Sequence, residues 1–90
     1  MVAGGKMRIR ETEDGYIVEF FPEAKVVERR EEPEKEWWVE VGYLEKEDVF
    51  VPARVFYGKR YSLNEVRKYA ERGEKCLRRA LGLRDEGQRN

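Results

Sequence analysis

The periodicity of the apolar residues changes once along this chain, close to Gly58. Before that point, short segments alternate apolar and polar residues, which is the two-residue repeat of a β-strand. After it, residues 62–81 place their apolar side chains three or four positions apart, as an amphipathic helix does. We therefore predict an α+β fold, in which a small antiparallel β-meander of three to four strands carries one C-terminal helix packed across one face.

The first hairpin is predicted over residues 7–12 and 16–21. Asp14-Gly15 lies between these two alternating runs, and glycine supplies the positive φ that a tight hairpin turn needs. Pro22 then ends the second strand, because proline cannot donate to a ladder.

Two further strands are predicted over residues 37–44 and 48–57. Trp37 and Trp38 are adjacent, so they must point to opposite faces of the sheet. We expect Trp37 to be buried under the helix and Trp38 to lie on the outer face. Pro52 predicts that its strand is either an edge strand or is interrupted by a bulge.

The segment between these pairs of strands is dominated by charge. Residues 28–36 contain no apolar side chain and have Pro33 near their centre, which is typical of a solvated loop. A short additional strand over residues 24–29 is also compatible with the pattern.

The helix carries its own start signals. Ser62 can cap it, Glu65 completes a capping box, and Tyr61 can pack on Val66 as a hydrophobic staple. Gly82 is a suitable stop. The apolar arc of the helix comprises Leu63, Val66, Tyr69, Ala70, Gly73, Cys76, Leu77, Ala80 and Leu81.

Gly73 lies near the centre of that arc, where it costs roughly 1 kcal/mol relative to alanine. One interpretation is that the helix crosses the sheet there, with Trp37 or Tyr43 filling the space. The other is a tolerated helix glycine.

Length and composition indicate one small domain over residues 1–90, with tails expected at 1–6 and 84–90. No apolar run approaches the roughly 20 residues of a membrane helix, and we expect no membrane association. The single cysteine, Cys76, cannot form an internal disulfide, which favours a reducing, cytoplasmic location. We expect Cys76 to pack inertly on the apolar arc.

Uncharged polar residues are scarce: the chain has one Ser, one Thr, two Asn, one Gln and no His. Abundant charge with few amides is typical of thermophilic proteins, so we expect a thermophilic source, or a virus or plasmid of one. The same scarcity leaves no catalytic triad, and we expect no enzyme activity. Neither a metal site nor a cofactor site is indicated.

Charge is divided unevenly along the chain. Residues 1–57 carry nine basic and fourteen acidic side chains, whereas residues 58–90 carry ten basic and five acidic ones. One interpretation is a nucleic-acid surface that follows phosphates. Its candidate residues are Lys59, Arg60, Arg67, Lys68, Arg72, Lys75, Arg78 and Arg79. The alternative is an ordinary solvated helix whose positive charge balances the negative charge of the sheet in the same chain.

A second candidate surface is the outer face of the sheet, which has no helix to cover it. Its predicted residues are Ile17, Phe21, Trp38, Phe50, Arg54 and Phe56. Aromatic rings there could stack unpaired bases, but Glu19 and Glu40 in the same stripe favour a protein partner or a two-fold homodimer. In a third arrangement, the loop 22–35 folds over this face.

An antiparallel sheet followed by a helix that begins at Ser62-Leu63-Asn64-Glu65 resembles, in its element order, the sheet-reading DNA-binding domains of some phage and transposon integrases. Residues 15–20 are similar to the second strand of small antitoxins with a partial ribonuclease-H-like fold. The basic C-terminal helix predicts a binding module for DNA or RNA, and the aromatic outer sheet face predicts, as the alternative, a protein-interaction or homodimerisation module.

Overall fold

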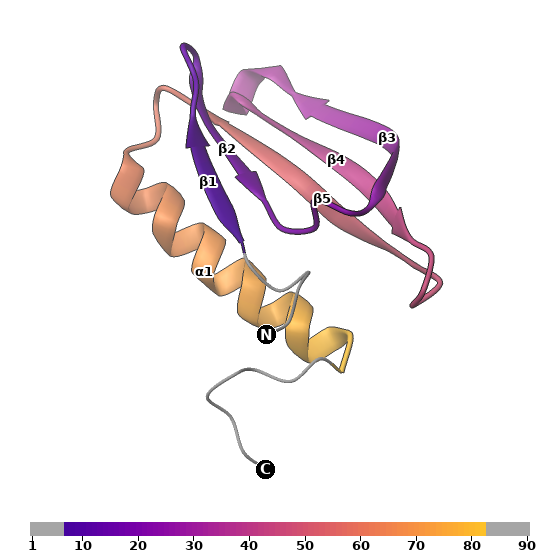
Figure 1. The fold of residues 1–90 in the computed structure, drawn as a ribbon. Helices are drawn as coiled ribbons and strands as arrows, with labels where there is room; N and C mark the ends of the chain where they lie inside the picture. Colours follow the sequence, from indigo (N-terminus) through magenta and orange to yellow (C-terminus); the bar gives the residue numbers. More distant parts are fainter. Residues whose placement is uncertain (1–6, 83–90) are drawn as a thin grey trace.

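The computed structural model describes residues 7–82, which form a five-stranded antiparallel sheet and one helix (Figure 1). The elements are β1 (Arg8–Glu11), β2 (Gly15–Glu19), β3 (Lys25–Glu32), the short 3-10 turn η2 (Pro33–Lys35), β4 (Trp37–Leu44), β5 (Val49–Gly58) and α1 (Leu63–Ala80). The α+β class is confirmed, but the sheet has five strands where three to four were predicted. The predicted tails, 1–6 and 84–90, lie outside the described residues.

The strands lie in the order β1-β2-β5-β4-β3, so β5 is the central strand and only β3 to β5 form a meander. Pro52 is therefore in the middle of the sheet, where a proline needs a local break in the ladder. The structure has that break: Glu40 pairs with Arg54 and Val41 pairs with Pro52, which leaves Ala53 as an extra residue. The predicted bulge is confirmed, and the edge-strand alternative is wrong.

The bulge also forms hydrogen bonds with the segment that connects β2 to β3 at the far edge of the sheet. The carbonyl of Ala53 accepts hydrogen bonds from the amides of Phe20 (2.8 Å) and Phe21 (3.3 Å). Gly42 then gives the segment room to pass, because a Cβ atom there would lie 2.7 Å from Cβ of Ala24. The crossing segment, residues 20–24, is visible in front of β5 in Figure 1.

The edge strand β3 corrects the prediction of a solvated loop that starts at residue 28. All eight residues of β3 are exposed, so neither face imposes an apolar repeat on the sequence. Charges replace that repeat, as in the ion pair between Arg30 and Glu28 at 2.8 Å. Because residues 25–32 pair with β4, this part of the loop 22–35 does not fold over the outer face, and only residues 22–24 pass over the sheet, beside Gly42.

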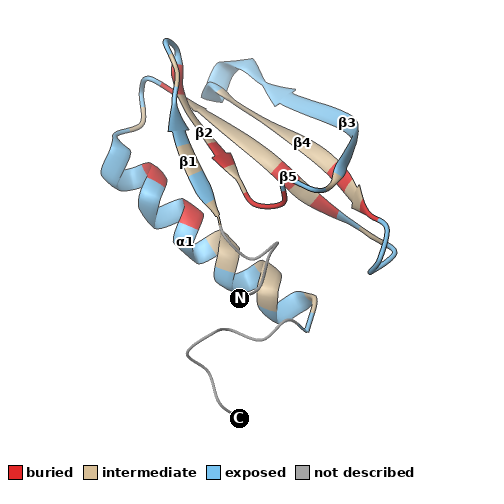
Figure 2. Cartoon of the chain, in the orientation of Figure 1, coloured by how far each residue is buried: buried red, intermediate tan, exposed pale blue. Residues whose placement is uncertain are grey.

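Helix α1 begins as predicted, with Ser62 and Glu65 forming the capping box. It packs against β2, and its buried residues Val66 and Ala70 meet Val18 in the core (Figure 2). The buried apolar core comprises Val18, Phe20, Phe21, Leu44, Val51, Val66 and Ala70. Within residues 7–82, no helix has both the length and the apolar character needed to cross a membrane.

Three expectations about the helix and its contact with the sheet were wrong. The side chain against Gly73 is that of Phe20, and neither Trp37 nor Tyr43 takes that place. Trp37 is half-buried, because α1 lies over the β2 side of the sheet and leaves β4 largely uncovered. Cys76 is also exposed, where an inert packed position was expected.

Candidate nucleic-acid interface

Cations in the sheet are neutralised locally. Every Lys and Arg within the described strands forms an ion pair with a carboxylate. The pairs are Arg8 and Arg10 with Glu19, Lys25 with Glu45, Arg29 with Glu31 and Glu40, Arg30 with Glu28, and Arg54 with Glu40. The strand cations are therefore already paired with carboxylates of the sheet and its turns.

Cations on the helix behave differently. Arg78 lies 3.9 Å from Glu74, which is four residues earlier in the helix, and forms an ion pair with it. Within residues 7–82, the other helix cations form no ion pair; these are Arg67, Lys68, Arg72, Lys75 and Arg79. The interpretation that the positive charge of the helix answers the acidic sheet of the same chain is therefore not supported by contacts.

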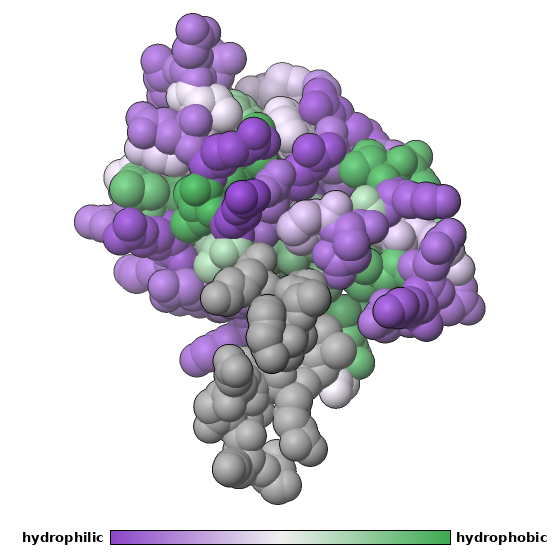
Figure 3. Space-filling model, in the orientation of Figure 1, coloured by the Kyte–Doolittle hydropathy of each residue, from purple (hydrophilic) through white to green (hydrophobic). Residues whose placement is uncertain are grey.

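Four of these cations form a continuous line, which we call the helix ridge: Lys68, Arg72, Lys75 and Arg79. Their spacing of four, three and four residues keeps them on the side of α1 opposite Val66. At 1.5 Å per residue, the ridge is about 16 Å long. All four side chains are exposed, and hydrophilic side chains lie along the upper, visible end of α1 on the left of Figure 3.

The remaining predicted cations lie around the ridge and not on it. Lys59 and Arg60 are exposed in the turn before α1, where the guanidinium of Arg60 is 5.6 Å from the ring centre of Tyr61. Arg67 and Arg78 lie on the neighbouring flank of the helix. A surface hollow on α1 is lined by Lys68, Glu71, Arg72, Glu74, Lys75 and Arg78.

Beside the ridge is a tyrosine cluster, Tyr57, Tyr61 and Tyr69, which sequence reasoning did not assemble. The ring of Tyr69 is 5.8 Å from that of Tyr57 and 6.3 Å from that of Tyr61. The hydroxyl of Tyr61 donates to the carbonyl of Lys35 at 3.1 Å. Burial raises the pKa of Tyr57, with a smaller contribution from the two neighbouring tyrosines. The sequence places all three tyrosines on the side of their elements that faces the contact between helix and sheet. This shared orientation is the signal from which the cluster could have been predicted.

The outer face presents a row of apolar side chains from three neighbouring strands: Ile17, Phe56 and Trp38. The rings of Trp38 and Phe56 stack at 5.5 Å and 11°. On the β3 side, the guanidinium of Arg29 lies 4.0 Å from the Trp38 ring centre. Because β5 and β3 flank β4, both faces of the Trp38 ring are occupied, and neither is free to stack a base.

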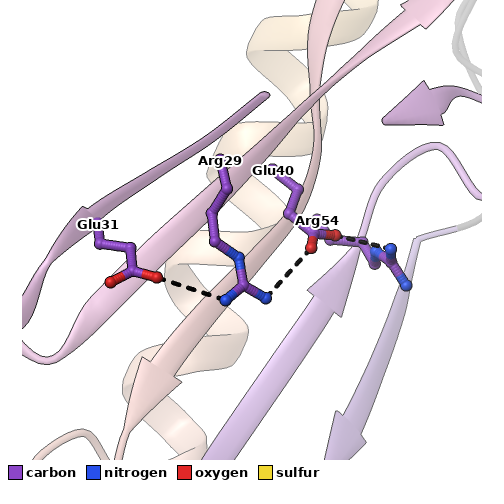
Figure 4. A network of polar contacts seen from close by, with 4 residues as sticks. All are labelled: Arg29, Glu31, Glu40 and Arg54. Carbon is purple, nitrogen blue, oxygen red and sulfur yellow. Dashed lines mark hydrogen bonds and ion pairs between the residues drawn. The ribbon is translucent and has the colours of Figure 1, made fainter. Parts of the chain in front are cut away.

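A network of charges borders this row (Figure 4). The carboxylate of Glu40 lies 2.7 Å from Arg54 and 3.3 Å from Arg29, and Arg29 also pairs with Glu31 at 3.4 Å. The contact with Arg54 is an ion pair without hydrogen-bond geometry. The side chain of Glu40 is only 12% exposed, so two cations share one nearly buried carboxylate.

Two residues predicted for the outer face lie elsewhere. Phe21 was placed wrongly, because it is buried in the core after the chain leaves β2 for the crossing segment. Phe50 is 66% exposed, but it lies against Tyr43 near the β4–β5 turn, far along β5 from Phe56. The row is therefore smaller than the predicted surface.

Among the residues that the structure describes, no group of His, Cys, Asp and Glu side chains is arranged to hold a metal ion. The surfaces described above present cations, aromatic rings and ion pairs. Comparisons with protein-family models, with curated proteins and with solved structures find no match to this chain.

Proposed function

We propose that this chain is a non-enzymatic module that binds DNA or RNA through the helix ridge. The observation that supports the proposal is the contrast between paired strand cations and ridge cations that form no ion pair within residues 7–82. Cations without a carboxylate partner lose no intramolecular contact when they meet phosphate. Their binding also releases counterions from the nucleic acid, which supplies most of the affinity of such contacts.

The ridge is suited to position a nucleic acid and not to read its sequence. Its members are lysines and arginines at the surface, and contacts of this kind reach phosphate oxygens without distinguishing bases. Lys59 and Arg60 extend the cationic surface beyond the start of α1. We therefore expect binding that depends weakly on sequence and strongly on salt.

The test compares two charge-reversal variants in a fluorescence-anisotropy titration with labelled DNA and RNA. K68E/K75E/R79E removes three ridge cations, whereas the control K25E/K35E/K46E makes the same change of charge on the sheet and its turns. Only the ridge variant should lose binding, and the wild-type affinity should fall steeply between about 50 and about 200 mM salt. Failure to bind at the lower salt, or equal losses in both variants, would contradict the proposal.

A second candidate function is self-association through the outer row. It is favoured by the ion pairs around Trp38 and Phe56, because a network without net charge does not repel a second copy of the same surface. Sedimentation at micromolar concentration should then show a dimer that Trp38→Ala converts to a folded monomer. Phe50→Ala, outside the row, should leave the dimer intact. A monomeric wild-type chain would exclude this function.

A further inference from the structure

Tyr69 combines a fixed position with an accessible ring. It is 39% exposed, although its ring contacts those of both Tyr57 and Tyr61. These contacts restrict the ring before any ligand arrives, so stacking on it would cost little conformational entropy. A pre-positioned, partly open aromatic ring is suited to accept a flat partner.

This ring adjoins the helix ridge. Tyr69 follows Lys68 directly and precedes Arg72 by three residues, so on the helix surface it lies between the ridge and the sheet. Cations that track a backbone beside aromatic rings are the combination that single-strand binders use.

The aromatic surface continues from the helix onto the sheet. Trp37 lies directly opposite Tyr57 in the β4–β5 ladder, and both are half-buried because α1 leaves β4 largely uncovered. The aromatic rings of Tyr69, Tyr57 and Trp37 therefore follow one another across the surface, from the helix to β4. On the outer face, by contrast, both faces of the Trp38 ring are occupied.

We infer that the helix ridge binds single-stranded nucleic acid, with its phosphates on Lys68, Arg72 and Lys75 and an unpaired base stacked on Tyr69. This inference rests on the proposed function and specifies its ligand. In a duplex, each base is stacked between its neighbours, and a ring beside the phosphate contacts cannot reach it. Tyr69 therefore contributes to single-strand binding and contributes nothing to duplex binding.

The experiment uses the whole chain and two labelled probes of about 15 units, a single-stranded pyrimidine oligonucleotide and a duplex of equal length. Tyr69→Leu should weaken single-strand binding at least about fivefold, which corresponds to ~1 kcal/mol for one stacked base. Duplex affinity should not change. Tyr69→Phe keeps the ring and should bind like the wild type, and Phe50→Leu is the control for loss of an exposed ring elsewhere.

A second readout does not depend on the stability of the Tyr69 variants. In Trp38→Phe, Trp37 is the remaining tryptophan, and its fluorescence should change on addition of the single strand and not of the duplex. Equal weakening of both probes by Tyr69→Leu, or tighter binding of the duplex by the wild type, would overturn the inference while leaving the helix ridge as the binding site. If neither probe binds, the proposed function itself fails.

Discussion

The ring of Phe20 lies directly against Gly73 in the middle of α1. A Cβ atom on Gly73 would be 3.2 Å from Cζ and 3.5 Å from Cε1 of that ring. Phe20 directly follows β2 and is the first residue of the crossing segment. The glycine therefore sets how closely the helix approaches the sheet.

We expect Gly73→Val to lower the free energy of unfolding by about 1–3 kcal/mol, because its branched side chain would overlap the Phe20 ring. In a Phe20→Leu background the overlap is relieved, and Gly73→Ala should then stabilise the protein by roughly 1 kcal/mol through helix propensity. Urea denaturation of Gly73→Ala, of Phe20→Leu and of the variant that combines them measures the coupling energy between the two positions. Strict additivity would show that the close contact carries no energy.

Glu40 should contribute more to stability than any exposed carboxylate of the sheet. Replacing it with glutamine leaves Arg29 and Arg54 without their shared anion, and we expect a loss of about 1–3 kcal/mol. Glu45→Gln is the matched control, because its ion pair with Lys25 is largely exposed and should contribute less than about 1 kcal/mol. Similar losses in the two variants, measured by urea denaturation, would refute the special role of Glu40.

Tyr57 should make the fold sensitive to alkaline pH. Burial raises the pKa of its hydroxyl above the usual value of about 10. The folded state therefore holds this proton more tightly than the unfolded state, so stability is unaffected below pH ~10 and falls as pH rises beyond it.

Tyr57→Phe removes that proton, and its stability should decline less between about pH 9 and about pH 11 than that of the wild type. Tyr43→Phe is the comparison variant, because the hydrogen bond from the Tyr43 hydroxyl to Asp48 also raises the pKa of that tyrosine, but by a contact near the surface and not chiefly by burial. Stability measured by urea denaturation across this range should therefore separate the two variants. An unchanged alkaline decline in Tyr57→Phe would assign the effect to another group.

The composition and the network around Glu40 together predict resistance to heat. We expect a melting temperature above about 80 °C, whereas mesophilic domains cluster at about 45–65 °C. Differential scanning calorimetry measures it directly, and about 1 M salt should lower it if the ion pairs contribute. A transition in the mesophilic range would remove the argument for a thermophilic source.

The helix and four of the five strands could be predicted because their signals are local. Ser62 and Glu65 lie one turn apart, and Asp14-Gly15 is contiguous with both strands that it joins. By contrast, β3 has no buried face, so its residues carry no apolar repeat from which a strand could be recognised.

The strand order could not be predicted, because it depends on contacts between distant segments. The carbonyl of Ala53 accepts hydrogen bonds from the amides of Phe20 and Phe21, which lie more than thirty residues earlier in the chain. Two-residue alternation placed Phe21 on the outer face, but the crossing segment turns it into the core. For the candidate site, the cations could be named from the sequence, whereas their lack of carboxylate partners depends on the fold.

The central position of β5 has a consequence for how the chain assembles during synthesis. The two hairpins, β1–β2 and β3–β4, both precede β5 and can close as soon as they leave the ribosome. Each hairpin must then keep an open edge, because among the strands of residues 7–82 only β5 pairs with both hairpins. The sheet is thus completed by insertion of its last strand between two earlier halves, and until then the edges of β2 and β4 that β5 will pair with are exposed to neighbouring chains.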